Sequence, residues 1–325
     1  MTLSSKNITT FLRRNALFTS ILIGITGYWI FTHTTWLVPI GRSAGPLLTD
    51  WMPIGMFLLL YFTFCRIQIS DLRPHVWHLV IQAVRATLSA TTVVIICLIG
   101  EGSEWKLIME GVFICFICPT AAAVVVVAEK LGGSVGSLTV FTIIANIVTM
   151  IIIPLLFPLV EREAGITFLS AALMLLKNVF LVLVAPLALA LLSRRIMPRI
   201  VTHFNHHRNI SFYLWCINLM IVSGITVGNI EHSTVAGQTL WALLLLPLPV
   251  CIMQFAIGKA VGRHWNDSIS AGQALGQKNT VVGIWLTITF LNPLAAVAPG
   301  AYVLWQNLVN GWQIWYKEKY GRLIW

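Results

Sequence analysis

The sequence predicts an all-α integral membrane protein, and its composition is the first observation that supports this class. Of the 325 residues, 58% are hydrophobic and only 10% are charged, with a mean hydropathy of +0.85. A soluble domain carries roughly 25% charged residues, so this chain has too little charge to remain in solution. Composition therefore excludes a soluble enzyme, a nucleic-acid-binding domain and a secreted disulfide scaffold.

The second observation is a series of ten apolar runs, each long enough to cross a bilayer as a helix. A spanning helix needs about 20 residues, and charged or Gly/Pro-marked breaks separate runs of this length. The connections are short, so residues 1–325 are predicted to form a single transmembrane domain. The expected helices cover residues 15–36, 45–66, 75–100, 105–130, 134–160, 166–194, 209–230, 234–262, 268–292 and 294–316.

The net charge of +10 is explained by the side of the membrane on which the loops lie. Most of the 21 Lys and Arg residues fall in connections that face the cytoplasm if the N-terminus is cytoplasmic. Because positively charged loops stay on that side, we expect both termini in the cytoplasm and the chain in the inner membrane of a bacterium. The same residues are expected to contact anionic lipid headgroups.

The ten expected helices divide into two sets of five, residues 15–160 and 166–316. An odd number of spans makes the second set enter the membrane from the opposite side, which predicts an inverted-topology repeat. In the fifth helix Phe141 precedes an asparagine by five positions, and in the tenth Tyr302 does the same. A chance match of two polar helical turns is the alternative explanation.

The fourth and ninth helices carry helix-breaking or polar residues in their middle. In the fourth, Pro119 follows an apolar run, and proline removes a backbone donor and clashes with the preceding turn. In the ninth, residues 272–280 hold two glycines, two glutamines, a lysine, an asparagine and a threonine between apolar flanks. We therefore expect both helices to be broken.

Non-helical backbone at membrane depth is tolerated only where it is buried in protein or lines a cavity. Two breaks in corresponding helices therefore indicate a site for a transported substrate near the midplane. Freed amides at half-helix N-termini suit a carboxylate or sulfate, and freed carbonyls suit a cation. The candidate binding residues are Pro119, Thr120, Gln277, Lys278, Asn279 and Thr280 at the breaks, with Thr142, Asn146 and Asn307 on the flanking helices.

These motifs resemble the bile acid:sodium symporter family. The resemblance rests on Cys118-Pro119, on the Gly/Gln/Asn segment at 276–279, on the Ser-Asp-Leu-Arg segment at 70–73 and on the ten-helix layout. It implies that the broken fourth and ninth helices cross in a core domain, and that helices one, two, six and seven form a panel domain. It also implies sodium-coupled uptake of organic anions such as bile acids, sulfated steroids or small carboxylates.

The residues that bind sodium in that family are replaced here. The Ser-Asn pair of the family's fourth-helix motif falls at Val124 and Val125, and the glutamate of its ninth-helix motif falls at Ala274. A hard cation needs several oxygen ligands, and valine and alanine side chains offer none. We expect no cofactor and no metal site; sodium stays a possible coupling ion whose usual ligands are missing.

Lys278 stands where the family has a glutamine, and three roles follow for it. Its ammonium could take the place of sodium and donate to the freed carbonyls of both broken helices. It could release its proton in one state of the cycle, since burial disfavours the charged form, or it could pair directly with an anionic substrate. The alternative without a functional role is a lysine that snorkels from the end of a half-helix.

Other charges within the expected spans are less informative. Arg85 in the third helix could snorkel or pair with an acidic group, and Lys177 in the sixth could face the substrate cleft. Lys106 and Glu110 are spaced for an i, i+4 pair near the outer interface.

The sequence thus predicts a secondary active transporter of organic anions that works by alternating access. Its expected partners are a small organic anion and membrane lipid, without nucleic acid, and its expected state is a monomer or weak homo-oligomer. A proton-coupled or uniporting exporter of the same fold is one alternative, and a membrane-embedded ligand sensor or enzyme is another. Catalysis is disfavoured because the site offers amides, hydroxyls and lone cations rather than a paired acid and base.

Overall fold

The computed structural model describes residues 16–65, 69–100, 102–161, 173, 180–206, 209–232 and 237–323. Within these ranges every named element is a helix, which confirms the predicted all-α class. Six helical stretches among the described residues are long and apolar enough to cross a membrane. The ten-helix inverted repeat is a finer arrangement that stays a prediction.

Four long, continuous helices occur in the first half of the chain, close to expected spans. The second of them begins well before the expected residue 45, because Pro39 lies in its first turn, where a missing N–H costs nothing. Pro46 and Pro53 lie inside the same helix without ending it. The four are α2 (Ala16–His33), α3 (Val38–Phe64), α4 (Val76–Ile99) and α7 (Val135–Val160), and the short η1 (Ile69–Asp71) precedes α4.

The fourth and ninth expected spans are each divided into two helices. The fourth consists of α5 (Glu104–Ile117) and α6 (Val124–Leu131), and the ninth of α14 (Ser268–Gly276) and α15 (Thr280–Phe290). Both interruptions fall at the motifs that predict them.

The rest of the chain is divided more finely than the sequence indicates. The eighth expected span is α12 (Gly237–Leu245) followed by α13 (Pro247–Arg263), because Pro247 has no N–H to continue the hydrogen bonding. The connection after the sixth span, which was expected to be a loop, holds α10 (Pro198–His206). The other elements are η2 (Phe180–Val184), α9 (Ala185–Ile196), α11 (Ile210–Glu231), η3 (Pro293–Ala296) and α16 (Val297–Tyr320).

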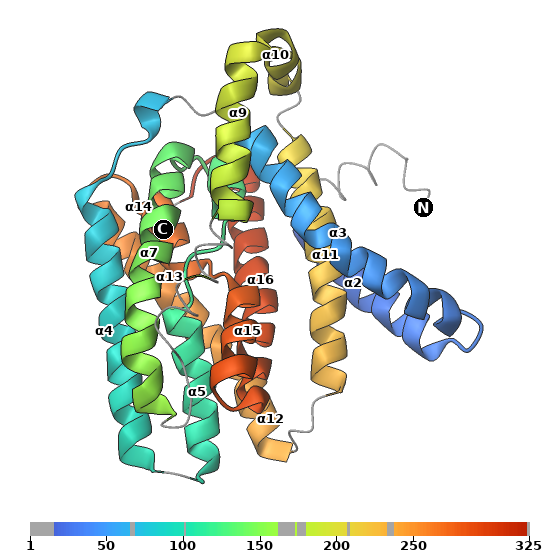
Figure 1. Cartoon of the computed structure of the whole chain (residues 1–325), viewed down its shortest axis with the longest axis vertical. Coiled ribbons are helices and arrows are strands. Elements are labelled where there is room, and N and C mark those ends of the chain that lie inside the picture. Colours follow the sequence, from blue (N-terminus) through green and yellow to red (C-terminus); the bar gives the residue numbers. More distant parts are fainter. Residues whose placement is uncertain are drawn as a thin grey trace.

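The helices form two groups that meet at α16. Figure 1 shows α4, α5 and α7 standing side by side, while α2 and α3 form a hairpin that leans away beyond α11. The α2–α11 contact is close, since a Cβ on Gly24 would lie 2.1 Å from the backbone oxygen of Met220. Helix α16 contacts α5 and α13 on one side and α2 and α11 on the other, so it joins the two groups.

Two glycines bring α13 and α14 into close contact. A Cβ on Gly258 would lie 2.4 Å from the backbone oxygen of Ala271, and one on Gly262 would lie 2.6 Å from the Ala271 Cβ. Small residues spaced by four are a common means of close helix approach in membranes. This contact fixes the position of α14 and of the break that follows it.

Gly258→Ala is expected to destabilise the protein by about 1–3 kcal/mol, the usual cost of overpacking, in thermal unfolding of the detergent-purified protein. Gly27→Ala is the matched control, because nothing lies within 4 Å of its added Cβ and alanine favours a helix over glycine. Equal melting temperatures for Gly258→Ala and the parent protein would contradict the close α13–α14 contact.

Candidate functional site

The two breaks meet in the interior of the protein and pair through their backbones. The N–H of Ala121 donates to the carbonyl of Gln277 at 3.1 Å, and the N–H of Asn279 donates to the carbonyl of Pro119 at 2.8 Å. These bonds form an isolated antiparallel bridge. The two motifs that the sequence singles out are therefore in direct contact. We call this structure the crossover; it comprises residues 118–121 and 277–279.

Side chains from the crossover reinforce the backbone pairing. The hydroxyl of Thr120, which is 2% exposed, donates to the carbonyl of Ala274 at 2.7 Å. The side chain of Asn279 accepts a hydrogen bond from the N–H of Val282 and so caps the start of α15. Thr280 is the buried first residue of that helix. The polar backbone groups freed by the two breaks thus find hydrogen-bond partners, either in the other broken helix or in a side chain at the start of the same half-helix.

The freed carbonyls at the end of α5 accept hydrogen bonds from side chains of distant helices. The last carbonyls of any helix have no partner within it. Here the carbonyl of Cys115 accepts from the Gln254 amide at 3.1 Å, and the carbonyl of Phe116 accepts from the Lys278 ammonium at 3.1 Å. Lys278, which is 1% exposed, therefore does not snorkel to an interface. It acts as a cap of α5.

Arg85 caps the next two carbonyls of the same helix end. One guanidinium nitrogen lies 3.3 Å from the carbonyl of Ile117, 3.4 Å from that of Cys118 and 2.7 Å from the hydroxyl of Thr149. The other donates to the carbonyl of Ala145 at 3.1 Å. Arg85 is only 3% exposed, so it does not snorkel, and it has no acidic partner among the described residues. The signal that could have identified this role is an arginine within an apolar helix that adjoins a Cys-Pro break.

Helix α16 supports the other side of the crossover. The Gln306 amide accepts from the backbone N–H of Lys278 at 2.7 Å and donates to its carbonyl at 3.2 Å. The hydroxyl of Tyr302 donates to the carbonyl of Gly276 at 2.8 Å and accepts from the Gln254 amide at 3.0 Å. Gln254, Tyr302 and Gln306 are polar groups that the sequence analysis did not place at the site.

The candidates on the flanking helices lie near the core of the protein without joining the crossover hydrogen bonds. Thr142, Asn146 and Asn307 each donate to a carbonyl one turn earlier in their own helix. The acceptor oxygens of Asn146, Asn307 and Gln277 are buried and have no hydrogen-bond partner among the described residues. They are available to a ligand or to water. Lys177 lies outside the described residues.

The three positions that match sodium ligands of the resembled family carry no side-chain oxygen here. Val124 and Val125 are fully buried at the start of α6, and Ala274 is 1% exposed, so the three positions present methyl groups to the interior. The carbonyl of Phe116, an oxygen suited to a cation, already accepts from Lys278. A hard cation needs several oxygen ligands together, and these positions supply none of them.

A cavity of about 340 Å³ lies between the C-terminal part of α11 and the segment that runs from α15 through η3 to the start of α16. Its wall is mostly apolar, with a buried hydroxyl from Thr226 and an imidazole from the exposed His232. Such a surface suits an apolar body with few polar groups. The lining residues are Thr226, Ile230, His232, Ile284, Ile288, Pro293, Leu294, Ala296, Val297 and Gly300.

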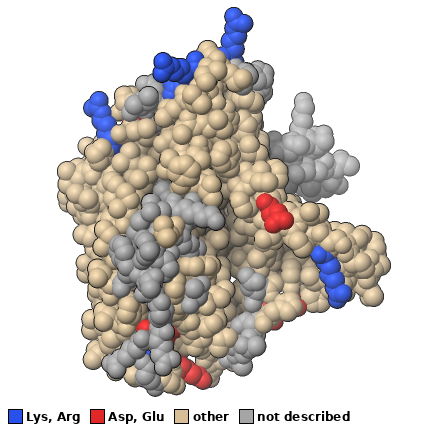
Figure 2. Space-filling model, viewed as in Figure 1, with Lys and Arg blue, Asp and Glu red and all other residues tan. Residues whose placement is uncertain are grey.

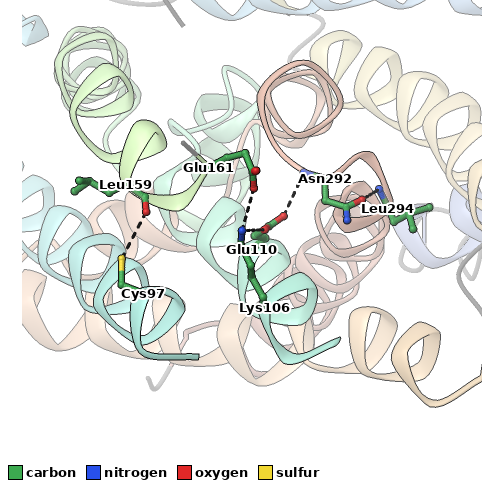
Figure 3. Close-up of polar contacts among 7 residues, drawn as sticks. All are labelled: Cys97, Lys106, Glu110, Leu159, Glu161, Asn292 and Leu294. Atoms are coloured by element: carbon green, nitrogen blue, oxygen red, sulfur yellow. Dashed lines mark hydrogen bonds and ion pairs between the residues drawn. The ribbon is translucent and has the colours of Figure 1, made fainter. Parts of the chain in front are cut away.

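A carboxylate network joins α5, α7 and the turn after α15 (Figure 3). The Lys106 ammonium lies 3.1 Å from a carboxylate oxygen of Glu161 and 4.0 Å from one of Glu110, which confirms the expected Lys106–Glu110 pair. The other oxygen of Glu110 accepts from the backbone N–H of Asn292 at 3.2 Å. These contacts tie the helix ends together away from the crossover.

Apolar helices of spanning length, together with two interrupted helices that meet at a buried polar crossover, define a polytopic membrane transporter. The chain belongs to the SBF-like CPA transporter family, whose family model matches residues 35–308. This family is bile acid:sodium symporter-like, so the resemblance seen in the sequence is confirmed. No curated protein matches the chain.

Thr120→Val keeps the shape of the side chain but removes its hydrogen bond to the carbonyl of Ala274 across the crossover. We expect a loss of about 1–3 kcal/mol, because that buried carbonyl is left without its hydroxyl partner. Thr287→Val is the matched control: its hydroxyl is equally buried but bonds within its own helix, to Gly283. The melting temperature should fall clearly more in the first variant, and equal effects would argue against a structural role for the crossover bond.

Proposed function

We propose that this chain is a secondary active transporter of organic anions, with the crossover as part of its substrate site and Lys278 in place of a coupling sodium ion. The observation that carries the proposal is a pair of buried cations, Lys278 and Arg85, that cap neighbouring carbonyls of α5. Among the described residues neither forms an ion pair.

Two buried cations without a bonded carboxylate favour the binding of an anion. A buried charge is costly unless it is paired, and the partial negative charge of the α5 carbonyl end offsets only part of two full charges. A carboxylate or sulfate that reaches the crossover would supply the missing charge. The unpartnered oxygens of Gln277 and Asn307 would then accept from hydroxyl or amide groups of the same ligand.

The cavity beside α15 supports an amphipathic substrate. Its wall of isoleucine, leucine, valine and proline side chains suits a hydrocarbon body, while α15 leads back to the crossover at Thr280. Bile-acid-like molecules, sulfated steroids and small carboxylates are the proposed classes, because each combines an apolar body with one anionic group.

The proposed architecture is ten spans in two inverted repeats, with a core that contains α5, α6, α14 and α15 and a panel that contains α2, α3 and α11. Alternating access then moves the panel relative to the core. Charge supports cytoplasmic termini: most of the Lys and Arg visible in Figure 2 lie at the end that carries α9 and α10. Positive loops favour the cytoplasmic side.

A thermal-shift screen of organic anions on detergent-purified protein tests the substrate class. A ligand that binds only the folded state increases the free energy of unfolding, by about 2.7 kcal/mol at a ligand concentration one hundred times its Kd. The melting temperature rises accordingly. We expect amphipathic anions to stabilise the protein equally with and without sodium, and matched neutral analogues to have no effect. Stabilisation by the neutral analogues alone would contradict an anion site.

Lys278→Ala tests the proposed role of the ammonium. With the anion found in the screen, uptake into liposomes should persist in sodium-free buffer and fall at least tenfold in the variant. Lys319→Ala, which removes an exposed lysine, should transport normally. Uptake that strictly requires sodium would contradict the proposed replacement of sodium by Lys278. Uptake that follows an imposed proton gradient would favour the proton-coupled alternative.

A further inference from the structure

A row of buried polar side chains runs along the face of α4 that meets α7. His78, Gln82, Arg85, Ser89 and Thr92 follow one another at spacings of three or four residues, and none is more than 4% exposed. Residues at these spacings lie on one face of a helix. The row therefore leads from the beginning of α4 to the level of the crossover and beyond it.

Hydrogen bonds fix His78 and Arg85, the two residues of this row that flank Gln82. The Nδ1 of His78 accepts from the backbone N–H of His75 at 3.2 Å, so its Nε2 carries the proton and donates to the Ser137 hydroxyl of α7 at 2.9 Å. His75 itself is exposed. At the other end, Arg85 bonds to α7 and to the crossover.

Gln82 lies between these anchors with both polar atoms of its amide unpartnered. Neither the oxygen nor the nitrogen has a hydrogen-bond partner among the described residues, and the same is true of the Nε of Arg85, one turn further along. On α7, the hydroxyl of Thr142 donates to the carbonyl of Leu138. Three buried polar atoms on adjacent turns therefore lack a hydrogen-bond partner in the part of the chain that the structure describes.

We propose that ordered water occupies the seam between α4 and α7, bonded to the Gln82 amide and bridging it to the Nε of Arg85. Buried waters typically make about three hydrogen bonds to otherwise unsatisfied polar groups, and these three atoms match that requirement. The seam then forms a hydrated route from the His75 end of α4 to the crossover. Its ligand is water, and no anion or metal is needed to explain it.

Such a route would connect the Lys278 ammonium with solvent at one end of the molecule. The ionisable groups of α4 along it are His75, His78 and Arg85, and the described parts of α7 and α14 contribute none. The other helices packed against α4 carry Glu104, Lys106, Glu110 and Cys115 on α5 and Cys251, Lys259 and Arg263 on α13. Water in the seam would let protons exchange at Lys278. This use of the seam rests on the proposed function, whereas the hydration itself does not.

Gln82→Leu tests for the water, because the proposal predicts a fall in melting temperature and a dry seam predicts a rise. If water bonds the amide, leucine removes those bonds and leaves the Arg85 Nε unpaired, so the melting temperature should fall by about 2–4 °C. If the amide is dry, leucine removes two unpaired polar atoms and the melting temperature should rise. Ile81→Leu, at the same depth in the apolar core and 0% exposed, is the control for packing disturbance and should have little effect.

A crystallographic or electron-microscopy map that resolves ordered water provides a second measurement. Density within hydrogen-bond distance of the Gln82 amide in the parent protein, absent in Gln82→Leu, supports the proposal. A rise in melting temperature, or a map that shows other buried waters but none at Gln82, overturns it. Neither measurement involves transport, so failure here is separable from failure of the sodium-free uptake experiment.

Discussion

The end of α5 inside the protein is the constraint on which the rest of the structure depends. Pro119 stops the helix, and the carbonyls before it would be costly in a low-dielectric interior without donors. The structure supplies a donor to each: Gln254 from α13, Lys278 from the partner break and Arg85 from α4. Side chains from three distant segments, α13, the break between α14 and α15, and α4, therefore hydrogen-bond to one helix end. These bonds fix the positions of the three segments around the crossover.

The same constraint explains why cations are buried in a chain so poor in charge. A lysine or arginine donates several hydrogen bonds from one side chain, which makes it an efficient cap for adjacent carbonyls whose dipoles point toward it. In the proposed function Lys278 takes the place of a coupling sodium ion. The positions of the family's sodium ligands then need no oxygen, and Val124, Val125 and Ala274 present methyl groups there.

The breaks are predictable from the sequence because proline and a cluster of glycine and amide residues act locally on the backbone. Lys278 is predictable as a special position because a lysine within an apolar run has no local explanation. The partners are not predictable, since Gln254, Gln306 and Tyr302 acquire their role at the site only when their helices pack beside the crossover. The sequence suggests an acidic partner for Arg85, whereas in the structure its guanidinium reaches backbone carbonyls of α5. Helix α10 falls within a connection between the expected spans, because its nine residues are too few to cross a bilayer.

The sequence by itself determined that this chain is an all-α membrane protein, where its two central helices break, and which family it belongs to. These properties depend on composition, on local backbone chemistry and on short motifs, all of which can be read from neighbouring residues. Only the tertiary structure decided that the two breaks pair with each other, that Lys278 and Arg85 cap the same helix end, and that Gln82 is left with an unpartnered amide. Those outcomes depend on contacts between residues 32 to 162 positions apart in the chain. Such contacts exist only in the folded protein, so neighbouring residues do not reveal them.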